Sequence, residues 1–374
     1  MKRNLMNNKN AIFIAATGQN VGKSTLSLGI IAALKKRYPS VGFIKPMGQQ
    51  HVRINDEIIV DKDVVLFKEH FKLKSDWKDM SPVIVPAGFT RDFIDHKVDA
   101  SKLIENIETS FKKIYQENAF TVVEGTGHVG VGSILGLNNA KIAAMLGVDM
   151  VIIASGGLGS TFDELSLNIA LCREHGANIR GVILNRVHDN KRAMIEEYFP
   201  KVLEKWNIPL LGIVPFNDLL NTPAIEDFET LFNAELISGK KHRYRHFQHP
   251  RLVAGSLESY MEEILPNELI ITPASREDII LKTLEKHSEV RKKDGVDLEG
   301  GIILTGRQSP SQKIVETIKE HDIPTLYAPI CSYDAMKMIT SFIAKTRTGD
   351  TVKIERAIRL AEEYVDFNLL TTKK

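Results

Sequence analysis

The stretch that decides the fold lies near the start of the chain and reads Ala16-Thr17-Gly18-Gln19-Asn20-Val21-Gly22-Lys23-Ser24-Thr25. It follows the apolar run 11–15 and precedes a segment, 26–34, in which apolar residues recur with helical spacing. A strand, a loop that ends in Gly-Lys-Ser and a helix form the layout of a phosphate-binding loop. In such a loop, backbone N–H groups converge on an anion, the lysine adds a positive charge and the serine hydroxyl can hold Mg²⁺.

The loop departs from the usual spacing at one position. The pattern G-x-x-x-x-G-K-[ST] places its first glycine where this chain has Thr17, and a glycine follows at Gly18. The alternative, a chance Gly-Lys-Ser on a surface loop, is disfavoured by the strand-like run before the loop and the helix-like segment after it. The residues expected to bind the nucleotide are Thr17, Gly18, Gln19, Asn20, Val21, Gly22, Lys23, Ser24 and Thr25.

The bulk properties are those of a globular protein with more than one domain. At 374 residues the chain exceeds one typical core, which predicts two domains. The 49 basic and 47 acidic residues give a net charge of only +2, so we expect neither nucleic acid nor a membrane surface as a partner. Two cysteines predict a reducing compartment and no disulfide framework. With a polar start at 1–10 and no apolar run of membrane length, we expect a cytoplasmic protein.

Short apolar runs alternate with amphipathic segments through the first half of the chain. This alternation is typical of an α/β fold, in which a parallel sheet carries helices on both faces. The expected strands are 11–15, 41–44, 119–123, 150–154, 181–184 and 210–214. The expected helices are 23–36, 92–117, 138–146, 162–175 and 191–206.

A basic and aromatic segment, 239–251, marks the expected domain boundary. Interleaved basic and aromatic residues also occur in nucleic-acid-binding segments, but a solvated linker is favoured because no larger basic surface is implied. Alternation resumes with expected strands at 269–271, 301–304 and 325–328 and expected helices at 276–286, 311–321 and 353–365. We therefore predict a P-loop domain at 1–238, a linker at 239–251 and a smaller α/β domain at 252–374.

Two charged residues sit where strands of the expected sheet end. Lys45 follows the run 41–44, and Glu124 follows the run 119–123. Ligands bind at this carboxyl edge in open α/β folds, and a strand-end carboxylate there can reach Mg²⁺. An ordinary surface lysine is the alternative for Lys45. His128, in the glycine-rich loop after Glu124, is either a base or a loop histidine that binds backbone.

Three further positions face the same edge. Asp63 is either a second carboxylate toward Mg²⁺ or, like Asp61, a candidate N-cap of the helix expected at 64–71. Asn185 ends a buried strand, where its amide either reads a purine base or starts a turn. Pro215 ends the next strand and is expected to wall the same pocket.

Together these motifs resemble dethiobiotin synthetase and its relatives, which include cobyrinic acid a,c-diamide synthases and the N-terminal region of long phosphotransacetylases. The resemblance covers roughly residues 11–238. It rests on the phosphate loop, Phe43-Ile44-Lys45-Pro46, Val123-Glu124-Gly125-Thr126-Gly127 and Val182-Ile183-Leu184-Asn185. The second half resembles a DRTGG domain through Ala254-Gly255, Ser275-Arg276-Glu277-Asp278, Gly300-Gly301-Ile302-Ile303-Leu304-Thr305-Gly306 and Ser332-Tyr333-Asp334-Ala335. By this resemblance, the chain ends where an acetyltransferase domain would begin.

The resemblance implies Mg²⁺–ATP chemistry at the strand edge. It places Lys23 and Lys45 on the γ-phosphate, with Glu124 as the third candidate catalytic residue. It makes Asn185 the reader of the base, and it implies a homodimer and a small carboxylate or carbamate acceptor that is activated as a mixed anhydride. The residues that it implies for the metal are Ser24, Asp63 and Glu124.

The chain also departs from its relatives. The segment 80–91 does not resemble the substrate-binding segment of the biotin enzyme, and Arg91 within it either attracts an anionic acceptor or is a surface arginine. Cys331 has no histidine beside it, so we expect a buried thiol rather than a glutaminase nucleophile. The lead hypothesis is an ATPase or an ATP-dependent carboxylate-activating enzyme. The alternative is a nucleotide-sensing regulatory or scaffold protein without turnover.

Overall fold

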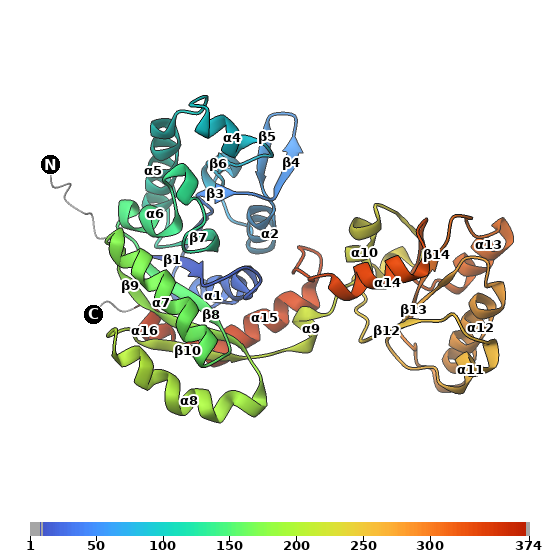
Figure 1. Cartoon of the computed structure of the whole chain (residues 1–374). Helices are drawn as coiled ribbons and strands as arrows, with labels where there is room; N and C mark the ends of the chain where they lie inside the picture. Colours follow the sequence, from blue (N-terminus) through green and yellow to red (C-terminus); the bar gives the residue numbers. More distant parts are fainter. Residues whose placement is uncertain (1–7, 9, 372–374) are drawn as a thin grey trace. The chain divides into compact units, whose positions relative to one another are not determined.

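Six parallel strands form the first sheet of the chain, in the order β10-β9-β8-β1-β7-β2. The computed structural model describes residue 8 and residues 10–371, so the expectation about residues 1–10 falls almost wholly outside it. The sheet is the centre of the first of two units (Figure 1). Its strands are buried along most of their length, as their apolar sequences predict. They are β1 (Ala11–Ala16), β2 (Val41–Ile44), β7 (Phe120–His128), β8 (Asp149–Ser155), β9 (Ile179–Val187) and β10 (Leu210–Pro215).

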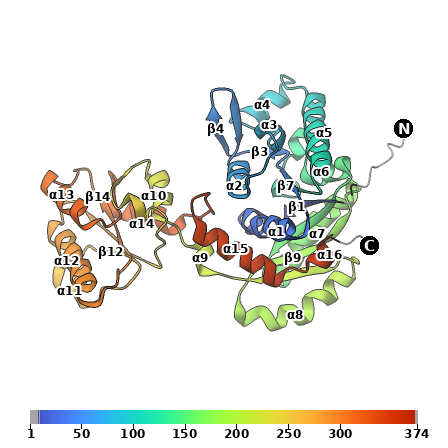
Figure 2. The same cartoon turned by 180° about the vertical axis from the view of Figure 1, so that it is seen from behind.

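Helices cover both faces of this sheet (Figure 2). From β1 to β2 the chain moves toward one edge of the sheet, and from β7 through β8 and β9 to β10 it moves toward the other edge. Because such crossovers are right-handed, α1 lies on one face of the sheet and α6, α7 and α8 lie on the other. The order reverses at β1, the position where open α/β sheets bind ligands. No helix in the described part of the chain has the length and apolar character of a membrane span. The helices of this unit are α1 (Lys23–Arg37), α2 (Lys62–Phe71), α3 (Trp77–Met80), α4 (Phe89–Ile94), α5 (Ala100–Glu117), η1 (Ser133–Leu135), α6 (Asn139–Leu146), α7 (Gly159–Glu174), α8 (Asp189–Glu204), α15 (Thr351–Tyr364) and α16 (Phe367–Thr371).

The connection between β2 and β7 carries two small strand pairs and a break that the sequence analysis missed. The pairs are β3 (Met47–Gly48) with β6 (Val83–Ile84), and β4 (His51–Asn55) with β5 (Ile58–Asp61). The single helix expected at 92–117 is wrong, because α4 ends at Ile94 and α5 begins at Ala100. His96 adopts a left-handed φ of 58°, and the Asp99 side chain caps α5 by accepting from Ser101 N–H at 2.9 Å.

The second unit is a smaller α/β domain around a five-stranded sheet with the order β11-β15-β14-β13-β12. β11 is antiparallel to β15, and the other pairs are parallel. Cys331 precedes α14 as its N-cap and is exposed, so the expectation of a buried thiol is wrong. The elements are α9 (Asp218–Asn221), α10 (Ile225–Phe232), β11 (Leu236–Ser238), η2 (Lys240–His242), β12 (His249–Leu252), α11 (Leu257–Glu262), β13 (Glu268–Pro273), α12 (Glu277–Asp294), β14 (Gly301–Thr305), α13 (Gln312–His321), β15 (Thr325–Ala328) and α14 (Ser332–Ser341).

The segment expected to be a linker, 239–251, lies inside the second unit, which begins at Asp218. One of its two aromatic residues, Phe247, is buried in the core that α10 and α14 form with the sheet. Its three arginines are paired with carboxylates, so the basic composition of this segment did not make it a solvated linker. The ion pairs are Arg243 with Glu229 at 2.7 Å, Arg245 with Asp297 at 2.9 Å and Arg251 with Glu268 at 2.5 Å.

The C-terminal segment returns to the first unit at Thr346, although 252–374 was expected to form one domain. The helix expected at 353–365 is present as α15, but it packs along α1 in the first unit. The approach is close at Gly29, where an added Cβ would lie 2.2 Å from Ala361 Cβ. An amphipathic helix does not reveal from sequence which sheet it covers, so this return was not predictable.

The return also protects the edge strand β10. Asp366 donates its backbone N–H to Leu211 O at 2.7 Å, and Arg180 donates to Leu370 O at 2.8 Å from within the sheet. The Asp366 bond, together with the antiparallel bridge between Gly212 and Val365, occupies an edge that would otherwise expose unpaired backbone groups. The second unit is therefore, in sequence, an insertion between Asn217 and Thr346 of the first unit.

Candidate functional site

The phosphate-loop conformation follows from one glycine between β1 and α1. Gly22 has a φ of 85°, and a Cβ at this position would lie 2.3 Å from Asn185 Nδ2, so only glycine fits. The Leu26 N–H donates to Gly22 O at 2.9 Å, which starts α1 directly after the loop. No side chain of the described residues caps this end of α1. The N–H groups of its first turn are therefore available to an anion.

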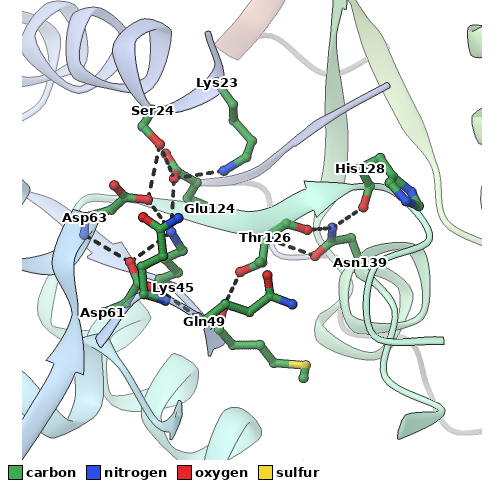
Figure 3. A network of polar contacts seen from close by, with 12 residues as sticks. Lys23, Ser24, Lys45, Gln49, Asp61, Asp63, Glu124, Thr126, His128 and Asn139 are labelled. Carbon is green, nitrogen blue, oxygen red and sulfur yellow. Dashed lines mark hydrogen bonds and ion pairs between the residues drawn. The ribbon is translucent and has the colours of Figure 1, made fainter. Parts of the chain in front are cut away.

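Lys23, Ser24 and Glu124 meet at the carboxyl edge of the sheet (Figure 3). Lys23 Nζ lies 2.9 Å from Glu124 Oε1, and Ser24 Oγ donates to the same oxygen at 3.0 Å. The Glu124 side chain is fully buried on β7, the strand beside β1. Its other oxygen, Oε2, is buried and has no hydrogen-bond partner among the described residues. Such an atom carries a desolvation penalty, which a bound cation would relieve.

Lys45 belongs to the same network, so the alternative of an ordinary surface lysine is wrong. Its side chain is 6% exposed, and its Nζ lies 3.0 Å from Asp61 Oδ1 and 3.8 Å from Glu124 Oε1. It also forms an ion pair with Asp63 Oδ2. Burial by itself would lower the pKa of Lys45, but the three surrounding carboxylates outweigh burial and raise it above its usual value. Lys45 is therefore a fixed positive charge.

The two aspartates at the start of α2 have different roles. Asp61 is the N-cap, because its Oδ1 accepts from the Asp63 backbone N–H at 3.0 Å. The Asp63 carboxylate instead faces the site, where its Oδ2 lies 3.2 Å from Ser24 Oγ. Burial would raise the pKa of Asp63, yet Lys45 and Lys23 outweigh burial and lower it. Asp61 is therefore the N-cap of α2, and the role of Asp63 as a second carboxylate toward Mg²⁺ stays a prediction.

Ser24, Asp63 and Glu124 together present a hydroxyl and two carboxylates. Within residues 8 and 10–371, no group of three or more His, Cys, Asp or Glu side chains is arranged to hold a metal ion. Mg²⁺ does not require such a group, because it is usually bound by one or two carboxylates, phosphate oxygens and water. These hard oxygen donors and the unpartnered Glu124 Oε2 fit a Mg²⁺ ion that binds with a nucleotide.

Residues at the end of β9 support the loop from the other side. Asn185 donates from Nδ2 to Val21 O at 2.8 Å, and Arg186 donates from Nη1 to Asn20 O at 2.5 Å. Asn185 therefore binds loop backbone in this structure, and its expected contact with a base stays a prediction. Pro215 ends β10, the neighbouring strand, and its role as a pocket wall likewise stays a prediction.

Helix α7 contributes two loop contacts that the sequence analysis missed. Glu164 Oε2 accepts from the Thr17 hydroxyl at 2.8 Å. Asn168, four residues later on the same helix face, donates to Thr17 O at 3.3 Å and accepts from the Val129 N–H at 3.2 Å. Asn168 thus joins the phosphate loop to Val129, the residue that follows β7. The i, i+4 spacing was visible in the sequence, but nothing in it indicated which element this face contacts.

His128 is the last residue of β7 and not part of a loop directly after Glu124, because β7 continues through Glu124 to His128. It is exposed, and its Nδ1 accepts from the Gly130 N–H at 3.1 Å. Asn139, which the sequence analysis did not select, holds the end of β7 by donating to Thr126 O at 2.9 Å and to His128 O at 2.7 Å (Figure 3). The histidine therefore binds backbone at the end of β7, which agrees with the second of the two alternatives for this residue.

Comparisons with known proteins agree with this architecture. Residues 10–224 match a family described as AAA domain (AAA_26), and residues 229–342 match the DRTGG domain family. The chain is 24% identical to the phosphate acetyltransferase of Nitratidesulfovibrio vulgaris, an alignment that covers 97% of this chain and 51% of the relative. It is 25% identical to the phosphate acetyltransferase of Pseudomonas aeruginosa, with 96% of this chain and 51% of the relative covered. The chain thus spans about half the length of these curated relatives.

Among solved structures, the MinC:MinD cell division protein complex of Aquifex aeolicus is 18% identical, with a TM-score of 0.36 over 56% of this chain and 83% of that chain. The AAA-domain match covers more than half of the chain, and the predicted combination of a P-loop domain, a DRTGG domain and a relationship to phosphotransacetylases is confirmed. The chain belongs to the AAA domain family of P-loop proteins and carries a DRTGG domain.

Proposed function

We propose that the first unit binds Mg²⁺–ATP and transfers its γ-phosphate, either to water or to a small carboxylate. One observation carries the proposal. Two lysines and two carboxylates converge on the open end of α1, and Glu124 Oε2 is buried there without a partner among the described residues. A protein that only needed to hold a phosphate would not require a buried carboxylate beside it, because like charges repel.

Each side chain has a distinct task in this proposal. The loop N–H groups and Lys23 bind the outer phosphates, while Lys45 offsets the charge that develops as the phosphoryl group moves. Ser24, Asp63 and Glu124 would hold Mg²⁺, which when bound supplies charge neutralisation on the phosphate oxygens. An acceptor carboxylate would become a mixed anhydride, and the same site with water would be an ATPase.

The charges of the network predict that metal and nucleotide bind together. Lys23 and Lys45 contribute two positive charges, while Asp61, Asp63 and Glu124 contribute three negative charges. The resulting net charge of −1 disfavours a free triphosphate, and a divalent cation changes its sign. We therefore expect ATP to bind tightly only when Mg²⁺ is present.

A second candidate function is nucleotide sensing without turnover. The observation that favours it is the return of the chain beside the phosphate loop. Thr346 Oγ1 lies 3.5 Å from Thr25 Oγ1, and α15 then packs along α1. The second unit, which contains the DRTGG domain, ends directly before Thr346. The chain that leaves this unit therefore contacts α1, the helix that follows the phosphate loop. A homodimer and a cytoplasmic location remain proposals that rest on the relatives and on composition.

Phosphate release by the purified protein tests the proposal. The wild type is compared with Lys23→Ala and with the matched control Lys36→Ala, which removes a lysine from the exposed end of the same helix. A hydrogen bond to a charged group contributes about 1.5–3 kcal/mol, so Lys23→Ala should lower turnover by about 10- to 150-fold. Lys36→Ala should leave turnover unchanged.

The same assay separates the two functions. It is run with and without a panel of small carboxylic acids as acceptors. If the wild type binds ATP but releases no more phosphate than Lys23→Ala under any of these conditions, phosphoryl transfer is excluded and sensing is supported.

A further inference from the structure

Asp61 has more bonding partners than the other carboxylates of the network (Figure 3). Its side chain is 1% exposed at the end of β5. Oδ2 accepts from the backbone N–H groups of Gln49 and Gln50 at 3.1 and 3.2 Å. Oδ1 accepts from Asp63 N–H and lies 3.0 Å from Lys45 Nζ. Asp61 therefore joins the strand-end lysine to the start of α2.

The surroundings of Asp61 prevent its carboxylate from moving toward a ligand. A Cβ on Gly48 would lie 2.6 Å from Asp61 Cβ, so the turn after β3 closes tightly over the side chain. The backbone N–H of Asp61 is also held, by Ser81 Oγ at 3.0 Å. Both carboxylate oxygens and the backbone N–H of Asp61 are thus engaged within the protein. Asp63 and Glu124 are less constrained, and they face the open end of α1.

We propose that Asp61 is a positioning residue that acts through Lys45 on the γ-phosphate of the bound nucleotide. The inference rests on the proposed function. In that function, Asp63 and Glu124 are engaged by the metal and no longer neutralise Lys45. Asp61 is then the carboxylate that still holds the lysine ammonium, 3.0 Å away. Asp61 keeps the Lys45 ammonium beside the phosphate loop and does not contact the nucleotide itself.

The alternative role for Asp61 is purely structural, as the N-cap of α2. Serine separates the two roles, because a serine side chain caps a helix nearly as well as aspartate but cannot form an ion pair with Lys45. Asp61→Asn is the second variant, since it keeps the shape of the side chain and removes the charge. Asp99→Ser is the matched control, because Asp99 caps α5 through the same type of bond, to Ser101 N–H at 2.9 Å.

The experiment measures the dissociation constants of Mg²⁺–ATP and Mg²⁺–ADP by titration calorimetry, with thermal melts to establish folding. The ratio of the two constants reports the γ-phosphate contact without any need for turnover. We expect Lys45→Ala to reduce the preference for ATP by about tenfold or more. Asp61→Ser and Asp61→Asn should reduce it by a similar factor. Asp99→Ser should leave it unchanged.

The double variant Asp61→Ser with Lys45→Ala gives the decisive comparison. If Asp61 acts through Lys45, its substitution has no further effect on the preference for ATP once the lysine is gone. An unchanged preference in folded Asp61→Ser, or an equal loss with and without Lys45, overturns the inference and leaves the proposed function intact. A wild type that binds neither nucleotide overturns both.

Discussion

Gly29→Val provides a quantitative test of how the C-terminal segment packs on the phosphate-loop helix. Gly29 lies in the middle of α1, where an added Cβ would be 2.2 Å from Ala361 Cβ and 2.7 Å from Ala357 O. Since Cβ atoms essentially never approach other heavy atoms within 3.0 Å, α15 would have to move by at least 0.8 Å. The obstacle includes helix backbone, so no side-chain rotation relieves it.

The magnitude follows from two opposing terms. Overpacking a close helix contact destabilises by about 1–3 kcal/mol, and the two extra methyl groups of valine place this substitution at the upper end. Valine has a higher helix propensity than glycine, which offsets only about 0.4 kcal/mol of this loss in stability. We expect a net loss of about 2–3 kcal/mol, which for a unit of this size lowers the melting temperature by about 5–10 °C.

Calorimetric melting of the full chain measures this effect, with Gly159→Val as the control. Gly159 begins α7, and no atom lies within 4 Å of a Cβ built there. The control should melt within about 2 °C of the wild type, because it adds the same side chain without a contact. If Gly29→Val has the same melting temperature as the control, α15 does not pack on α1, and the assignment of the residues from Thr346 onward to the first unit is refuted.

Three further predictions concern separate parts of the chain. Cys331 is exposed, whereas Cys172 is buried and its burial raises the pKa of its thiol to about 12. A thiol reagent at pH 8 should therefore modify Cys331 alone in the folded protein. Equal labelling of the two cysteines before unfolding would contradict this prediction. Burial lowers the pKa of His287 to about 4, so the folded state resists protonation. The contribution of this residue to the free energy of unfolding is fully present above pH 6.5, and about 3 kcal/mol of it is lost as the pH falls through 4. Urea unfolding of wild type and His287→Gln at several pH values measures this loss. An equal pH dependence in both proteins would contradict the prediction. Glu124→Gln should weaken the affinity for Mg²⁺ at least tenfold when ATP binding is titrated with magnesium. Even residues that only hydrogen-bond to metal ligands change metal affinity by about 10- to 100-fold. An unchanged magnesium dependence would show that Glu124 does not bind the metal.

The sequence predicted those features that depend on local pattern. The phosphate loop, the six strands of the first sheet and the position of Lys45 directly after β2 follow from apolar runs and a glycine-containing motif, and the structure has them where they were expected. Glu124 was expected where its strand ends, but β7 continues beyond it to His128, and its side chain still reaches Lys23. Parallel strands bring their carboxyl ends to one edge. For this reason the sequence alone was enough to place Lys23 and Glu124 together, although they are 101 residues apart.

The features that the sequence did not predict depend on tertiary contact. Glu164 and Asn168 bind the phosphate loop from α7, but their helix shows only a polar i, i+4 pair. The basic segment 239–251 looked like a linker because sequence does not show that its arginines are paired with distant carboxylates. The return of α15 was missed for the same reason, since an apolar helix face does not specify its partner.

The most direct test of the central claim is a crystal structure of the full chain with Mg²⁺ and a non-hydrolysable ATP analogue. We expect the analogue to lie in the loop after β1, with Lys23 Nζ moved from Glu124 to a phosphate oxygen. We also expect Mg²⁺ beside Ser24, Asp63 and Glu124. A nucleotide bound outside this loop, or a Lys23–Glu124 ion pair that persists beside bound nucleotide, would refute the proposed phosphate site.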